Sequence, residues 1–192
     1  MAMMDRIKGM LLSPRTEWPK VAAEPATVQS IYTGWVMILG LLGPIAILLW
    51  SSVFLGGLGV VAAVASYVNT LVGIAIIALI ADLIAPTFGG TRDYVAALKL
   101  VAYAATAVWI AQIALIVPVL GALVALVGAI YSVYLLFLGA PVLRKCSADK
   151  AVAYTIVLLL CAIVIGYIIR AILLGVGFGA GMGMPAPRIG GF

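Results

Sequence analysis

Histidine is absent from the 192-residue sequence. This absence removes the usual general base, the commonest transition-metal ligand and every Ser-His or Cys-His nucleophile pair. Only two cysteines are present, Cys146 and Cys161, and their separation fits neither a CxxC redox pair nor a zinc-ligand spacing. The sequence therefore predicts no catalytic residue, no metal site and no cofactor, and it argues against an enzyme.

Charge is also scarce. Charged residues make up 9% of the chain and hydrophobic residues 66%, whereas a soluble domain has about 25% charged and about 45–50% apolar residues. Uncharged stretches of the roughly 20 residues needed to cross a bilayer occupy most of the chain after Ser30. The composition predicts an all-α, polytopic integral membrane protein with no separate soluble domain.

Glycine, proline and charged residues divide the apolar sequence into five expected transmembrane helices. The expected spans are 31–55, 60–84, 94–117, 119–143 and 151–174. An amphipathic cytoplasmic segment, 1–30, comes before them. A flexible glycine-rich tail, 175–192, follows them, because alternating glycine gives neither a packing face nor helix propensity.

Basic residues give the orientation. With five spans, nine of the eleven Lys and Arg residues fall on one side of the membrane, and only Arg170 and Arg188 fall on the other. By the positive-inside rule, we expect the N-terminus in the cytoplasm and the C-terminus outside. The basic residues are dispersed among apolar helices, so the net charge of +5 does not indicate nucleic-acid binding.

The first twelve residues carry apolar side chains at helical spacing, with Arg6 and Lys8 interleaved. This pattern predicts a short helix lying on anionic lipid headgroups of the bilayer, with Trp18 as an anchor at headgroup level. A frayed basic tail is the alternative. We therefore expect Arg6, Lys8 and Trp18 to contact the membrane surface.

The stretch from Asp82 to Tyr103 holds the only charges between Glu24 and Arg144. An ionisable residue near the hydrocarbon of a membrane indicates a functional site. We hypothesise that Asp82 pairs with Lys99 or Arg92 across two antiparallel spans and that the stretch forms a structural lock or a site for a protein or lipid. The candidate residues are Asp82, Pro86, Phe88, Gly89, Gly90, Arg92, Lys99 and Tyr103.

Arg170 lies about 19 residues into the last span, near the far interface by the rise of 1.5 Å per residue. There its side chain can extend to the headgroups. A functional buried charge is the alternative.

Several motifs in this order make the chain resemble the bacterial Yip1-domain proteins, which are relatives of the eukaryotic Yip1/YIPF five-span membrane proteins. The motifs are Leu12-Ser13-Pro14, Glu17-Trp18-Pro19, Ala23-Glu24-Pro25, Tyr32-Thr33-Gly34, Asp82-Leu83-Ile84-Ala85-Pro86, Phe88-Gly89-Gly90, Ala97 through Tyr103, Tyr131 through Leu136 and Leu138-Gly139-Ala140-Pro141. Ala107 departs from the family, which has Thr-Pro shortly after the tyrosine, so we expect a straighter third helix here.

The resemblance implies five spans, a cytoplasmic N-terminus, a place in a bacterial inner membrane and a non-enzymatic part in membrane organisation. We therefore expect a scaffold or adaptor that binds a membrane or cytoplasmic protein, or lipid headgroups, at its cytoplasmic face. The alternative is a small transporter or channel whose pathway is lined by Asp82, Lys99, Tyr103, Asn69 and Gln112. A homo-oligomer packed through small-residue stripes is left open.

Overall fold

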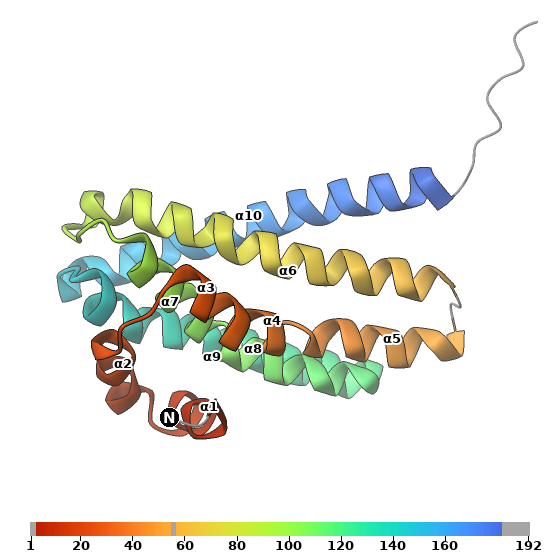
Figure 1. Cartoon of the computed structure of the whole chain (residues 1–192), viewed down its shortest axis with the longest axis horizontal. Helices are drawn as coiled ribbons and strands as arrows, with labels where there is room; N and C mark the ends of the chain where they lie inside the picture. Colours follow the sequence, from red (N-terminus) through yellow and green to blue (C-terminus); the bar gives the residue numbers. More distant parts are fainter. Residues whose placement is uncertain (1–2, 55–56, 182–192) are drawn as a thin grey trace, which may run out of the picture.

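The computed structural model describes residues 3–54 and 57–181, which form helices and short connections and contain no strand. Five segments are long and apolar enough to cross a membrane. They are Val28–Ser51, Gly59–Phe88, Tyr94–Ile116, Val119–Arg144 and Asp149–Leu173. The predicted all-α class and the five spans are confirmed, and the spans run side by side along the long axis in Figure 1.

Two helices come before the spans, α1 (Met3–Leu12) and α2 (Pro14–Ala23). Figure 1 shows them against the end of the bundle where α6 finishes and α7 begins. Pro14 ends α1 and starts α2, because proline lacks an N–H donor and is tolerated in the first turn of a helix. The N-terminal segment is thus a pair of folded helices.

The first span consists of α3 (Val28–Ile31), the π-helical η1 (Tyr32–Val36), α4 (Met37–Leu39) and α5 (Leu42–Phe54). Thr27 starts it through a capping box with Ser30. The interruption at Gly40 and Leu41 comes just before Pro44, whose missing N–H cannot continue the helical ladder. The span therefore departs from a regular helix at two places.

The second span is α6 (Gly57–Ile84), which continues into the 3-10 turn η2 (Ala85–Phe88). The third consists of α7 (Tyr94–Ala104), α8 (Thr106–Ala111) and the 3-10 segment η3 (Gln112–Ile116). The expectation of a straighter third helix is wrong, because the α-helix is broken at Ala105. The Ser132 hydroxyl accepts a hydrogen bond from the Val108 N–H at 3.0 Å, so α9 stabilises this break without a proline.

The last two spans are α9 (Pro118–Arg144) and α10 (Ala148–Gly181). The α10 helix continues through the start of the segment that was expected to be a flexible tail. The structure therefore corrects the boundary at residue 175, because helical hydrogen bonding continues to Gly181. The rest of that predicted tail, 182–192, lies outside the described residues.

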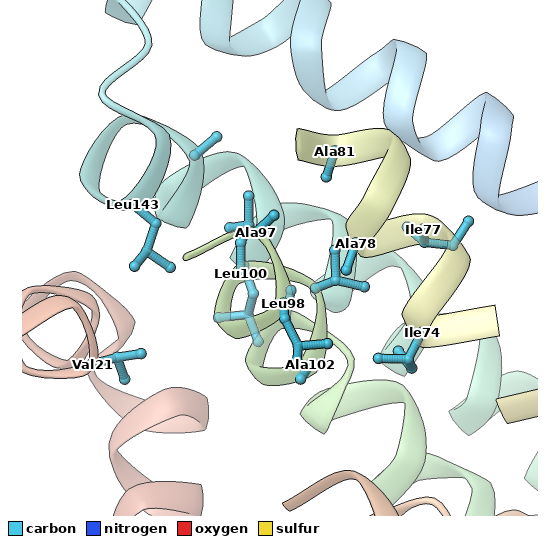
Figure 2. Close-up of a cluster of buried hydrophobic side chains, with 14 of the residues drawn as sticks. Val21, Ile74, Ile77, Ala78, Ala81, Ala97, Leu98, Leu100, Ala102 and Leu143 are labelled. Carbon is cyan, nitrogen blue, oxygen red and sulfur yellow. The ribbon is translucent and has the colours of Figure 1, made fainter. Parts of the chain in front are cut away.

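The α7 helix is the centre of the protein. It is buried nearly all round, as expected only for a helix enclosed by other helices. Figure 2 shows Leu98 and Leu100 of α7 among side chains from α2, α6 and α9. Large apolar side chains on α9 and α10 are exposed instead, Val119 by 77% and Ile163 by 60%, as expected for helices that face lipid. Since Asp93 caps the start of α7 and α7 carries Lys99, the core fixes the position of these charged residues.

Candidate functional site at the charged end of the bundle

One end of the bundle collects almost all the charge. We call it the charged end; it consists of α1, α2 and the connection after α2 as far as Ala26, residues 85–93 and residues 144–150, with the adjoining first two turns of α7 and last turn of α6. Figure 1 shows these segments together, although they come from three separate parts of the chain. The charged end contains every residue that we proposed for a binding site or a membrane-surface contact, except Tyr103, which lies one helical turn deeper than Lys99; Asn69 and Gln112 of the transporter alternative lie outside it.

Asp82, in the last turn of α6, pairs with Arg144, the last residue of α9. Arg144 Nη2 lies 2.8 Å from Asp82 Oδ1, and the arginine side chain is completely buried. Arg144 Nη1 also donates to the Asp93 carbonyl at 2.5 Å, while the Arg144 carbonyl accepts from the Thr91 N–H at 3.2 Å. We call this arrangement the Asp82–Arg144 clasp, since it joins α6, α9 and the loop before α7.

The clasp corrects the predicted partner of Asp82. Neither Lys99 nor Arg92 pairs with Asp82, because the buried guanidinium of Arg144 occupies that position. Asp82 Oδ1 also accepts a hydrogen bond from the Asp93 N–H at 2.6 Å. The Asp93 carboxylate itself caps α7 by accepting from the Ala96 N–H at 3.0 Å, so both carboxylates have structural partners.

The two glycines of the loop permit this close packing. Gly89 has a φ of +76°, a left-handed conformation that side chains oppose. A Cβ on Gly90 would lie 2.6 Å from the Arg144 carbonyl oxygen and 2.9 Å from Cys146 Sγ. Pro86 lies in the turn η2 before these glycines, and Phe88 packs edge-on against Tyr154 with a centroid distance of 5.7 Å. The sequence Phe88-Gly89-Gly90 is therefore needed to place backbone against backbone at the clasp.

Lys99 binds the end of α2. Its ammonium donates hydrogen bonds to the Val21 carbonyl, at 2.9 Å, and to the Glu24 carbonyl, and the residue is 6% exposed. The last carbonyls of a helix have no partner within the helix, and they carry the negative end of its dipole. The Lys99 ammonium donates to these carbonyls and places a positive charge at the negative end of the dipole, so this buried cation of α7 caps α2.

Tyr131 caps the C-terminal end of α1. Its hydroxyl donates to the Leu11 carbonyl at 2.7 Å across 120 residues of sequence. Thus α7 and α9 each supply one polar side chain to the C-terminal end of one N-terminal helix. The membrane-spanning helices hold both N-terminal helices by their unsatisfied carbonyls.

Buried charge also joins the N-terminal helices to each other. Arg6 is 4% exposed and lies 3.1 Å from the Glu17 carboxylate, and it also pairs with Glu24. Glu17 is 2% exposed and pairs in addition with Lys20 at 3.0 Å. A buried charge of this kind is tolerated when it is paired.

The burial of Arg6 and Trp18 corrects their predicted contact with the membrane surface. Trp18 is fully buried, and a Cβ on Gly139 would lie 2.7 Å from two atoms of its ring. Gly139 of α9 thus receives the indole of Trp18, which joins the motifs Glu17-Trp18-Pro19 and Leu138-Gly139-Ala140-Pro141. Lys8 is exposed, so of the three residues it alone is free to reach headgroups.

Two hollows open beside the docked helices. One has a volume of about 440 Å³ and includes Glu24, Asp93, Lys99 and Lys145 in its lining. The other, of about 290 Å³, is lined by Arg6, Glu24, Trp35 and Tyr103 among others. The Tyr103 ring stacks at a tilt on Trp35 with a centroid distance of 4.6 Å. Arg92 is exposed and lines neither hollow.

Cys146 lies beneath the clasp and is 4% exposed. Burial raises the pKa of its thiol, and the nearby Arg144 guanidinium opposes this rise only in part. The thiol therefore stays protonated at neutral pH and is a poor nucleophile. Among the described residues, no group of three or more His, Cys, Asp or Glu side chains could hold a metal ion.

Arg144, Glu17 and Tyr131 are important contacts of the charged end that we did not predict. Topology offered a signal for Arg144, because five spans bring the end of the fourth to the same side as the end of the second. For Glu17 the signal was its place one residue before Trp18, on a helix separate from the one that carries Arg6. No feature of the sequence indicated that the Tyr131 hydroxyl would reach α1.

The five apolar spans, together with two N-terminal helices held on the charged end, define a polytopic α-helical integral membrane protein. Within this class the chain belongs to the Yip1 family, because the Yip1 domain matches residues 8–169. The match includes the C-terminal half of α1 and most of α10. Comparison with curated proteins gave no match. Comparison with solved structures gave none either.

Proposed function

We propose that this Yip1-family protein is a non-enzymatic scaffold of a bacterial inner membrane, and that its charged end binds a partner protein in the cytoplasm. The observation that carries the proposal is the hollow of about 440 Å³ between the docked N-terminal segment and the bundle. The acidic residues Glu24 and Asp93 line it together with the exposed Lys145. Charges of both signs complement a polypeptide segment better than a uniformly anionic lipid surface.

The rigidity of this surface supports the proposal. Buried pairs and carbonyl caps hold α1 and α2 in one position, and a preorganised surface loses less conformational entropy when a partner binds. The charges that could otherwise act in acid-base chemistry are used in structure: Asp82 pairs with Arg144, and Glu17 pairs with Arg6. These contacts favour a binding role over an enzymatic one.

The orientation is part of the proposal. The charged end carries nine of the eleven basic residues of the chain, and the positive-inside rule favours the cytoplasm for such an end. Fusion of a reporter that is active only in the cytoplasm to either terminus tests this. We expect activity from the N-terminal fusion alone, and activity from the C-terminal fusion would contradict the orientation.

The polar residues of the transporter alternative lie apart. A Cβ on Gly43 would lie 2.4 Å from Gln112 Oε1, so Gln112 packs against α5. Asn69 lines a separate cavity with Arg170, and Tyr103 lines the hollow beside Arg6. A transport site requires such groups to converge near the middle of the membrane, so this arrangement supports the scaffold instead.

A comparison of two charge reversals tests the proposed partner site. Lys145→Glu changes a residue that lines the hollow, whereas Lys8→Glu changes another exposed lysine, on α1 and outside the hollow. Each variant is purified in native-lipid particles, and its co-purifying proteins and lipids are measured by mass spectrometry. We expect a protein that accompanies the wild type and Lys8→Glu but is lost from Lys145→Glu. Equal recovery with all three, or a change in lipids alone, would contradict the proposal.

A further inference from the structure

Arg170 occupies a cavity at the opposite end from the charged end. The cavity has a volume of about 100 Å³ and is lined by Ile47 of α5, by four residues of α6 that include Ser66 and Asn69, and by Arg170 of α10. Figure 1 shows α5, α6 and α10 extending to the end of the bundle opposite α1 and α2. Three polar side chains therefore share a small space in an otherwise apolar part of the molecule.

The guanidinium of Arg170 has no acidic side chain of its own chain nearby. All six Asp and Glu residues belong to the charged end. The nearest along its own helix is Asp149, about 32 Å away at 1.5 Å per residue. An unpaired cation at the edge of hydrocarbon is unfavourable, and no Asp or Glu side chain is near enough to pair with Arg170, so a bound anion would stabilise it.

The cavity is already polar enough to hold an anion. Asn69 Oδ1 is buried and accepts no hydrogen bond from the described residues, so it can orient the Arg170 guanidinium. The remaining guanidinium N–H groups, the Asn69 amide N–H groups and the Ser66 hydroxyl are donors. A space of this volume holds about three water molecules, or one group of the size of a phosphate.

The depth of Arg170 selects the source of that phosphate. Arg170 lies 21 residues after Asp149, about 32 Å along α10 at 1.5 Å per residue, which is close to the thickness of about 30 Å of a hydrocarbon core. Tyr167, one turn before it, is 76% exposed, and exposed tyrosines are enriched at headgroup level. Other exposed side chains of α10 before Arg170, Val164 and Ile168, are apolar, as expected for a helix that faces lipid.

We propose that Ser66, Asn69 and Arg170 bind the phosphodiester of a phospholipid at the end of the bundle opposite the charged end. Arginine recognises phosphate through two parallel N–H donors, and the amide and hydroxyl of α6 complete the set. The acyl chains of the same lipid lie along α6 and α10. The site is independent of the partner-binding role proposed for the charged end.

The test uses the full-length protein, delipidated in detergent and titrated with phosphatidylglycerol. Binding is measured by native mass spectrometry and by the shift in Tm. Diacylglycerol with the same acyl chains lacks the phosphate, and inorganic phosphate lacks the chains. We expect one retained phosphatidylglycerol per protein, and stabilisation by neither of the two controls.

Two variants examine the residues. Arg170→Gln should weaken phosphatidylglycerol binding at least about tenfold, because a hydrogen bond to a charged group is lost. Asn69→Leu keeps the charge and suits an apolar environment; it should weaken binding several-fold. Arg92→Gln removes an exposed arginine at the charged end and should leave the affinity unchanged.

Three results would overturn the proposal. The first is an affinity within about twofold of wild type for both Arg170→Gln and Asn69→Leu, since the loss of even one charge-assisted contact exceeds this. The second is equal stabilisation by diacylglycerol, which would show that the phosphate is not recognised. The third is equal stabilisation by inorganic phosphate, which would show that the source is not a lipid.

Discussion

The Asp82–Arg144 clasp makes a prediction about coupling that a double-mutant cycle can measure. Asp82→Asn keeps an oxygen that can accept from the Asp93 N–H but removes the charge that faces Arg144. The guanidinium is completely buried, and it would retain the Asp93 carbonyl but lose its counter-ion. Removing one partner of a buried pair costs about 3–5 kcal/mol, so we expect the free energy of unfolding to fall by about that amount.

The reverse substitution should cost less. The Asp82 side chain is 14% exposed and keeps its bond from the Asp93 N–H, so the carboxylate that Arg144→Gln leaves behind can still reach water. The loss is then that of a charge-assisted hydrogen bond, about 1.5–3 kcal/mol. In the double variant no charge is left without its partner, so the combined loss should fall short of the sum by about 1–3 kcal/mol.

Unfolding in mixed micelles of lipid and detergent, titrated with a denaturing detergent and followed by tryptophan fluorescence, gives these free energies. Arg92→Gln is the matched control, because it removes an exposed arginine from the same loop, and its effect should stay within about 0.5 kcal/mol. Losses that add for Asp82→Asn and Arg144→Gln would refute the clasp. A second cycle, of Asp82→Asn with Lys99→Gln, should be additive within about 0.5 kcal/mol, because Lys99 binds carbonyls of the α2 end instead.

Further consequences follow for other contacts of the charged end. Lys99→Gln should raise hydrogen exchange at the C-terminal end of α2 without changing exchange in α10, because the cap on the α2 carbonyls is lost. Equal exchange at the end of α2 in the wild type and in Lys99→Gln would contradict this role. Gly90→Ala should lower the free energy of unfolding by about 1–3 kcal/mol through overpacking, whereas Gly73→Ala, with open space around it, should not lower it. In a Cys161→Ala background, Cys146 should react slowly with iodoacetamide at pH 7.5 and faster as the pH rises well above the ordinary range for a thiol, because burial raises its pKa; rapid labelling of the folded protein at pH 7.5 would contradict it.

The positions of the spans along the chain could be predicted from the sequence, but the contacts between the spans could not. Hydropathy and chain-breaking residues locate the spans, because each must cross the same thickness of hydrocarbon. Which helices touch is a different matter, since a side chain that faces lipid and one that faces another helix can be equally apolar. We paired Asp82 with residues of the next span in the chain, whereas its partner is at the end of the fourth.

The prediction that the N-terminal segment lies on the membrane surface failed for a related reason. An amphipathic helix that lies on headgroups and one that docks on protein have the same apolar periodicity. Arg6 could be read as a headgroup contact because its counter-ions, Glu17 and Glu24, lie on another helix and in the connection after it. The burial of Trp18 depends on a small residue at Gly139, more than a hundred residues away, and no local pattern contains that information.

The caps on α1 and α2 determine the order in which the molecule can be completed. The chain is made from its N-terminus, and Leu11 leaves the ribosome 120 residues before Tyr131, whose hydroxyl receives its carbonyl. Lys99 likewise follows the α2 end that it binds by 75 residues or more. Until α7 and α9 have entered the membrane, the first two helices have no docking surface, and contacts between residues so distant in sequence form late. The segment synthesised first is thus the last to find its place, and its docking marks the moment at which the membrane-spanning part is complete.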